Sequence, residues 1–207
     1  MTVSANLYRA VMADPVFYYD FNSPFAYIAA HRVDDVLPVC PRWQPIAFAF
    51  LLIAQRREPW SFDVEGRGPT MEDCERRAAA LGLPLQWPDG WPRESYSLLP
   101  LRAAVVAEQA GLLREFSCAA FRHHFSHREG VGGLDGVLAA AAEAGLDPEQ
   151  VRAHVDDPDV KEAVKDATDA AIDLGVFGIP TVQIGDELFW GDDRLEEAAA
   201  ALAPHLG

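Results

Sequence analysis

The fold of this chain is decided by residues 16–27, which read Val-Phe-Tyr-Tyr-Asp-Phe-Asn-Ser-Pro-Phe-Ala-Tyr. The apolar run from Val16 to Asp20 is rich in β-branched and aromatic residues, which predicts a β-strand. Ser23 and Pro24 are typical of a helix start, with serine as the N-cap and proline at the first helical position. We therefore expect the first strand to lead directly into a helix from Phe25 to Leu37.

The rest of the chain continues the alternation of strands and helices. We expect a second strand at Arg42 to Ala47, with the apolar residues Phe48 and Phe50 in the core beside it. Several helices should follow between about Thr70 and Val155, and an amphipathic helix at Pro158 to Leu174. The closing segment predicts a hairpin across the Gly185-Asp186 turn and a last helix, at residues 182–184, 188–190 and 194–202. The sequence thus predicts a split α/β sheet with a helical insertion.

The composition limits the partners of this protein. There are 32 acidic side chains against 17 lysines and arginines, which gives a formal net charge of -15. So acidic a surface repels phosphate backbones and anionic membranes, so we expect neither a nucleic acid nor a membrane as partner. The longest apolar stretch, Ile46 to Ala54, is far shorter than the roughly 20 residues of a membrane span. Residues Met1 to Asp14 show no signal-peptide pattern, so we expect a cytoplasmic protein.

Cysteines and histidines give no sign of a metal or disulfide site. Cys40, Cys74 and Cys118 are widely spaced without a C-x-x-C motif, which fits three ordinary thiols in a reducing compartment. His123 and His127 are four residues apart, a spacing that can bind a metal, but no H-E-x-x-H pattern and no third ligand accompany them. We therefore expect no metal.

A second motif precedes the hairpin, where Gly178-Ile179-Pro180-Thr181 follows Gly175. Together with the first motif it resembles the DsbA-like thioredoxin superfamily, and more narrowly the 2-hydroxychromene-2-carboxylate isomerases and kappa-class glutathione transferases. The resemblance is carried by residues 20–27, 73–78, 81–85 and 175–194. It implies a thioredoxin-like α/β fold with an all-helical insertion between its βαβ and αββα halves. The expected boundaries are residues 1–65 with 156–207 for the discontinuous thioredoxin-like domain, and 66–155 for the insertion.

The resemblance also implies a site. Ser23 takes the place of the nucleophilic cysteine, and its hydroxyl would donate a hydrogen bond to the thiolate of a bound thiol beside the helix N-terminus. The Ile179–Pro180 bond is expected to be cis, and the Ile179 backbone to pair with glutathione. Asp192 and Asp193 match the pair that holds the γ-glutamyl end. From the residues alone, Asp193 to Glu196 reads as an aspartate variant of the capping box.

The chain departs from the family pattern at two expected asparagines. Arg57 replaces the first in Arg57-Glu58-Pro59, and we take it as a candidate cofactor-binding residue. Glu94 replaces the second, in Pro92-Arg93-Glu94-Ser95. Both changes fall where cofactor and substrate would sit, so the cofactor that the resemblance implies is either glutathione or another low-molecular-weight thiol. The composition is compatible with a GC-rich bacterial genome, in which such a different thiol is conceivable.

These features lead to three hypotheses. The first is a thiol-dependent isomerase of an aromatic or conjugated carbonyl compound, like 2-hydroxychromene-2-carboxylate isomerase. The second is a kappa-like glutathione S-transferase, and the third is a redox-inactive DsbA-like protein that binds peptides. A disulfide oxidoreductase is not expected, because Ser23 and Ala26 occupy the C-x-x-C positions. The kappa-like proteins that the chain resembles are dimers, which makes a homodimer one candidate, but the sequence leaves the oligomeric state open. The loop tryptophans Trp60, Trp87 and Trp91 either line an apolar substrate pocket or pack into the core.

Overall fold

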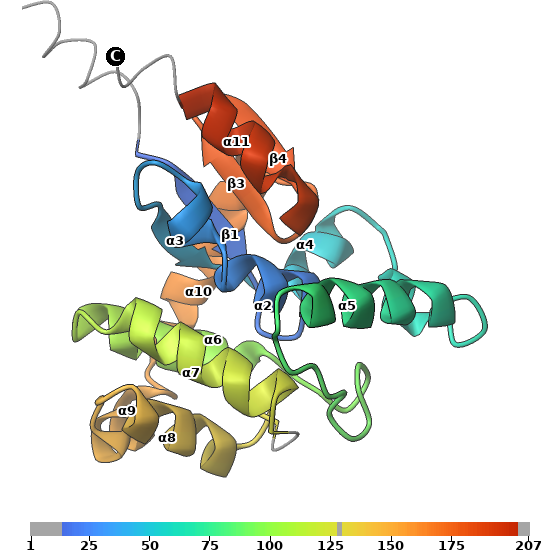
Figure 1. Cartoon of the computed structure of the whole chain (residues 1–207). Coiled ribbons are helices and arrows are strands. Elements are labelled where there is room, and N and C mark those ends of the chain that lie inside the picture. The colour runs from blue at the N-terminus through green and yellow to red at the C-terminus, as the bar shows by residue number, and fades with distance from the viewer. Residues whose placement is uncertain (1–13, 128–129, 203–207) are drawn as a thin grey trace, which may run out of the picture.

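The computed structural model describes residues 14–127 and 130–202 (Figure 1). The expectation about a signal peptide at Met1 to Asp14 concerns residues that, apart from Asp14, lie outside this range. The described chain forms a four-stranded sheet with helices packed on both faces.

The sheet joins the two ends of the chain. Its strands are β1 (Val16–Tyr19), β2 (Arg42–Pro45), β3 (Thr181–Ile184) and β4 (Glu187–Trp190), in the order β2-β1-β3-β4. β1 pairs with β2 in parallel and with β3 antiparallel, and β3 and β4 form the predicted antiparallel hairpin. The end of β1 and the start of β3 therefore lie side by side, which brings the two sequence motifs together.

The first helix is shorter than predicted. Instead of one helix from Phe25 to Leu37 there are two, α2 (Pro24–Ala30) and α3 (Val33–Val36). The break falls at Arg32, whose guanidinium donates to the carbonyl oxygen of Asp192 at 3.1 Å. A tertiary contact thus accompanies the interruption of a segment whose local pattern is helical.

The segment after β2 also differs from the prediction. It forms a short helix, α4 (Phe48–Ala54), that begins where the Phe48 N–H donates to the buried carboxylate of Asp20 at 2.9 Å. Phe48 is partly buried, but Phe50 is 36% exposed, so its placement in the core was wrong. An all-apolar run carries no periodicity that separates a helix from a strand end.

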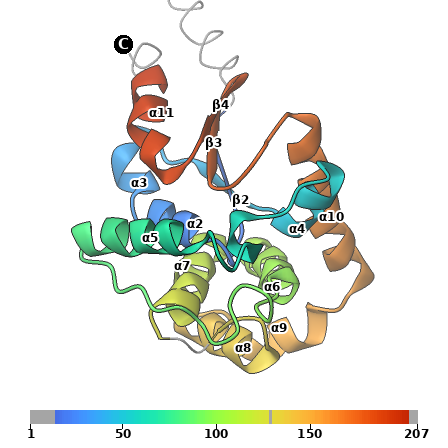
Figure 2. The ribbon, with the colours of Figure 1, turned by 90° about the vertical axis from the view of Figure 1, so that its right-hand side faces the viewer.

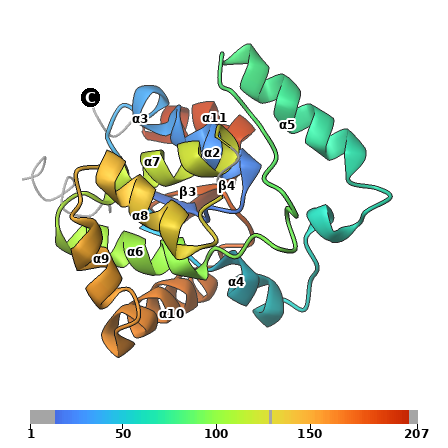
Figure 3. The same ribbon diagram turned by 90° about the horizontal axis from the view of Figure 1, so that it is seen from below.

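Most of the remaining helices gather on one side of the sheet. They are α5 (Gly68–Ala80), α6 (Leu98–Gln109), α7 (Leu113–Phe125), α8 (Leu134–Glu143), α9 (Pro148–His154), α10 (Pro158–Asp173) and α11 (Leu195–Leu202), with the 3-10 turns η1 (Trp60–Phe62) and η2 (Asp192–Arg194). Figure 2 shows α6 to α9 below the sheet and α11 above them, and α5 stands apart at the edge in Figure 3. In the described part of the chain, no helix has the length and apolar character needed to cross a bilayer. The proposed domain boundaries stay a prediction.

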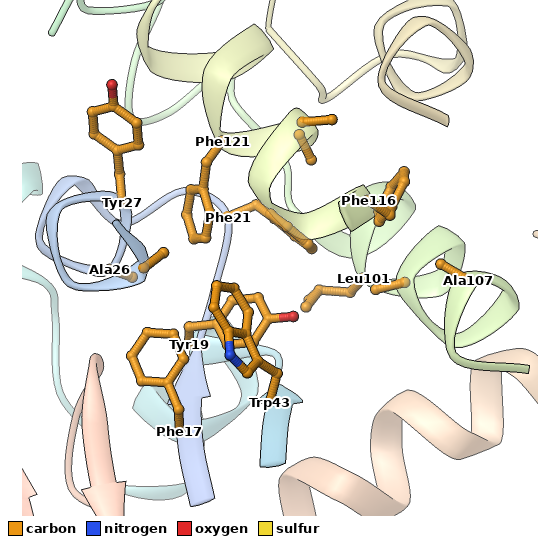
Figure 4. Packing of buried hydrophobic residues seen from close by; sticks show 14 of the residues in the cluster. Phe17, Tyr19, Phe21, Ala26, Tyr27, Trp43, Leu101, Ala107, Phe116 and Phe121 are labelled. Atoms are coloured by element: carbon orange, nitrogen blue, oxygen red, sulfur yellow. The ribbon is translucent and has the colours of Figure 1, made fainter. Parts of the chain in front are cut away.

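The core follows the alternation of β1. Phe17 and Tyr19 point to the face covered by α2, α6, α7 and α11, where their rings stack with centroids 5.3 Å apart (Figure 4). Val16 and Tyr18 point to the opposite face, against α4 and α10. The hydroxyl of the fully buried Tyr19 lies 2.6 Å from Ser117 on α7. Both faces of β1 are therefore buried, and its C-terminal end is held rigidly at the site described next.

Candidate active site

One cavity of about 670 Å³ lies at the C-terminal end of β1. This volume is within the usual range for small-molecule sites. Its wall includes every site residue predicted from the sequence, namely Ser23, Arg57, Ile179, Pro180, Asp192 and Asp193. Four segments far apart in the chain therefore contribute to one pocket.

Ser23 is the N-cap of α2, as predicted. Its Oγ accepts a hydrogen bond from the Ala26 N–H at 3.2 Å, and Pro24 occupies the first turn. Among the described residues, nothing accepts a hydrogen bond from the Ser23 hydroxyl. The hydroxyl proton is therefore free to be donated to an acceptor in the cavity.

The Ile179–Pro180 peptide bond is cis, which confirms the expectation. The Pro180 carbonyl accepts from the Gly191 N–H at 2.9 Å, whereas within the described chain neither the N–H nor the C=O of Ile179 has a hydrogen-bond partner. Unpaired backbone groups next to a strand can pair with an extended peptide segment. The cavity thus contains an open backbone edge beside Ser23.

Asp192 and Asp193 border the cavity and form ion pairs there with Arg77 on α5. The Arg77 Nη1 lies 2.9 Å from Asp192 and 3.5 Å from Asp193. Burial raises the pKa of the Asp192 carboxyl above its usual value, and the charge of Arg77 opposes that rise. Asp193 is exposed. The predicted capping box is not seen, because the Glu196 carboxylate pairs with Arg32 instead.

Sequence reasoning did not assign a role to Arg77 or to Asp20. The Asp20 side chain is almost completely buried at the cavity wall. It accepts hydrogen bonds from the Asn22 and Phe48 N–H groups at 2.9 Å and from the Ser97 hydroxyl at 3.0 Å. Burial raises the pKa of Asp20, and these donors oppose the rise. Asp20 therefore connects the starts of α2, α4 and α6. The sequence signal that could have identified it was a single carboxylate at the end of an otherwise apolar strand.

Arg57 borders the cavity next to the loop that leads to Ile179. Its guanidinium lies 3.8 Å from the centroid of the Phe177 ring and donates to the Phe177 carbonyl oxygen at 3.2 Å. The Phe177 ring in turn packs edge-on against Trp190, with centroids 5.1 Å apart. The Arg57 guanidinium is thus held against Phe177, which precedes Ile179 and its open backbone edge by two residues.

Aromatic side chains form a wall of the cavity. Phe25 and Trp60 have ring centroids 6.1 Å apart, and Trp60 and Trp91 have centroids 5.7 Å apart. The Trp91 indole N–H donates to the Asn22 carbonyl oxygen at 3.2 Å, which holds this loop against the β1–α2 turn. Trp87 stacks behind Trp91 and does not border the cavity. Trp60 and Trp91 therefore border the pocket and also pack with the core, so both alternatives hold for these two residues.

The two departures from the family pattern have different outcomes. Arg57 borders the cavity, as expected, but Glu94 does not. The Glu94 side chain folds back over the turn at Gly90, whose positive φ of 72° suits glycine. The expectation that Glu94 sits at the ligand was therefore wrong, and its neighbour Arg93 faces the cavity instead.

The three cysteines lie away from the cavity. All three cysteines are free, and none borders the cavity. Within residues 14–127 and 130–202, no three histidine, cysteine, aspartate or glutamate side chains are arranged to hold a metal ion. Burial raises the pKa of the Cys74 thiol to about 12, so this cysteine is unreactive at neutral pH.

Comparison with known proteins places the fold. Residues 16–203 match the DSBA-like thioredoxin domain family. The 2-hydroxychromene-2-carboxylate isomerase of Sphingobium xenophagum is 29% identical over 190 residues, which cover 87% of this chain and 93% of that protein. Human glutathione S-transferase kappa 1 is 30% identical over 134 residues, or 59% of each chain. A solved 2-hydroxychromene-2-carboxylate isomerase structure superposes with a TM-score of 0.77 at 25% identity, covering 93% of this chain and 95% of that one. The predicted thioredoxin-like fold is confirmed.

Proposed function

Since the chain belongs to the DSBA-like thioredoxin domain family, we propose that it is a glutathione-dependent isomerase of an aromatic or conjugated carbonyl compound. The observation that carries this proposal is the meeting of Ser23, the open Ile179 edge and the Asp192–Asp193 pair at one cavity. The names of its relatives, 2-hydroxychromene-2-carboxylate isomerase and glutathione S-transferase kappa 1, support the reaction class.

The residues at the cavity fit glutathione. The free N–H and C=O of Ile179 suit the backbone of its cysteine residue, which would add as a short antiparallel strand. The exposed carboxylate of Asp193 suits the γ-glutamyl ammonium, and the Arg57 guanidinium suits a carboxylate at the other end of the ligand. A different low-molecular-weight thiol with the same termini would fit the same groups.

Ser23 is the residue that would act on the sulfur. Its hydroxyl proton is uncommitted within the described chain, so it can donate to a thiolate in the cavity. A hydrogen bond to a charged group contributes roughly 1.5–3 kcal/mol, which lowers the pKa of the bound thiol by about one to two units. Because α2 has only 7 residues, we assign this effect to the hydroxyl and not to a long helix dipole.

The bound thiol supplies a sulfur nucleophile that adds reversibly to a conjugated double bond and leaves again without being consumed. The protein would position the partners: Ile179 and Arg57 would fix the thiol, and the rings of Trp60 and Trp91, inclined to each other by 51°, would present an apolar surface to an aromatic substrate. A reduced thiol suits the cytoplasm, which we propose as the location. The homodimer stays a prediction.

Calorimetric titration with reduced glutathione tests the proposal. We expect binding to wild type that weakens for Ser23→Ala, and weaker binding of the analogue with serine in place of cysteine. Incubation with a 2-hydroxychromene-2-carboxylate and product analysis then separates the reactions, since an isomer keeps its mass whereas a transferase yields a conjugate. No affinity for any cellular thiol, with retained peptide binding, would instead support the peptide-binding hypothesis.

A further inference from the structure

The cavity contains an arginine that the thiol does not use. Arg93 follows the cis peptide bond between Trp91 and Pro92, and its guanidinium lies 4.2 Å from the centroid of the Phe62 ring. Within the described chain it forms no ion pair, whereas Arg77 is paired with Asp73 and Asp192. A cation held over an aromatic ring is kept in place without being neutralised.

None of the described acidic groups that border the cavity neutralises the positive charge of Arg93 by an ion pair. Asp192 and Asp193 face Arg77, and the Asp20 carboxylate is satisfied by three donors of its own. Glu58 borders the cavity but no ion pair joins it to Arg93, and Glu94 folds away over the turn at Gly90. In a protein with a formal net charge of -15, an unpaired cation in a ligand cavity is a local attraction for an anion.

The same two segments that carry this cation also carry the aromatic wall. η1 contributes both Trp60 and Phe62, and the loop that contains the cis Trp91–Pro92 bond contributes both Trp91 and Arg93. The wall reaches α2 through the contact of Trp60 with Phe25, which lies two residues after Ser23. Ser23 and Arg93 therefore border the same cavity, and contacts among these aromatic rings connect the two segments that carry them.

We propose that Arg93 binds the carboxylate of the acceptor substrate and so selects aromatic or conjugated carboxylic acids over their uncharged analogues. This inference rests on the proposed function, since it assigns the second ligand of the same site. A planar guanidinium can bind a carboxylate with two parallel hydrogen bonds, which fixes orientation as well as charge. Arg93 is thus a specificity-determining residue, and Arg57 remains with the thiol.

Binding of cinnamate and of uncharged cinnamamide tests this assignment, read by quenching of tryptophan fluorescence and confirmed by calorimetry. We expect wild type to prefer cinnamate about tenfold, the lower end for a hydrogen bond to a charged group, because Arg93 is exposed. Arg93→Gln should abolish the preference and Arg93→Lys should keep part of it. Arg152→Gln, on the exposed surface of α9, is the matched control and should behave as wild type.

Glutathione titrations of the same variants separate the two proposals. Arg93→Gln should bind glutathione as wild type does, which also shows that it is folded, whereas Arg57→Gln should lose glutathione affinity and keep the preference for cinnamate. A preference that survives Arg93→Gln, or that Arg57→Gln removes equally, would overturn the assignment, as would absence of cinnamate binding. Arg93-dependent cinnamate binding without any affinity for glutathione would support this subsite while overturning the thiol-dependent function.

Discussion

His124 on α7 should make folding stability depend on pH. It is 2% exposed, and its Nε2 lies 3.2 Å from the Ser95 hydroxyl and 3.4 Å from the Asn22 side-chain oxygen. The Val131 N–H donates to its Nδ1 at 3.4 Å, so the neutral ring with hydrogen on Nε2 fits these partners. A second proton on Nδ1 would point at the Val131 N–H, which is itself a donor, so the charged ring does not fit this site. Burial lowers the pKa of His124 to about 3.

The size of the effect follows from linkage. Between pH 6.5, the ordinary histidine pKa, and about pH 3, His124 is protonated in the unfolded chain but neutral in the folded chain. The contribution of His124 is therefore fully present above this window and is lost as the pH falls. At pH 5 the loss is about 2 kcal/mol.

Urea unfolding of wild type and His124→Gln at pH 7, 6 and 5 measures this loss. All other titrating groups cancel in the difference between the two proteins, apart from the contacts of the substituted side chain itself. We expect the stability advantage of wild type over the variant to shrink by about 2 kcal/mol from pH 7 to pH 5. A constant difference in stability between the two proteins across this range would show that protonation of His124 does not destabilise the fold.

Two further substitutions test the contacts around the site by urea unfolding. Arg77→Gln leaves the buried Asp192 carboxylate without its cation, so we expect a loss of about 2 kcal/mol at pH 7 that shrinks at lower pH as Asp192 takes up a proton; an equal loss at every pH would contradict this. Thr168→Val removes the acceptor of the Ala47 N–H, a buried contact of 2.9 Å, and should cost about 1–3 kcal/mol; no measurable loss would contradict it.

Local chemistry predicted some features of the fold well. The Ser23 cap, the hairpin and the amphipathic helix near the C-terminus depend on short patterns that the tertiary structure does not override. The break after α2 could not be predicted, because it coincides with a contact between Arg32 and the distant Asp192. The helix α4 was missed because its sequence is uniformly apolar.

At the site too, some residues could be predicted from sequence motifs, whereas others depend on tertiary contacts. The resemblance predicted residues 179–180 and 192–193 at the cavity, and the structure brings them together with Ser23. Asp20 and Arg77 each have a partner nearby in the sequence, Asn22 and Asp73, but their contacts with Phe48 and Asp192 join residues more than 20 positions apart, which no local pattern could assign. Which of two neighbours, Arg93 or Glu94, borders the cavity depends on the conformation of the loop after Trp91, which the sequence does not specify.

We propose that Ser23 stabilises the thiolate of a bound thiol. The most direct test is a pH titration of thiolate absorbance for glutathione bound to wild type and to Ser23→Ala. We expect a thiol pKa that is lower in the wild-type complex than in free glutathione, and higher by about one to two units in Ser23→Ala than in wild type. An identical thiol pKa in both complexes, or one equal to that of free glutathione in wild type, would contradict it.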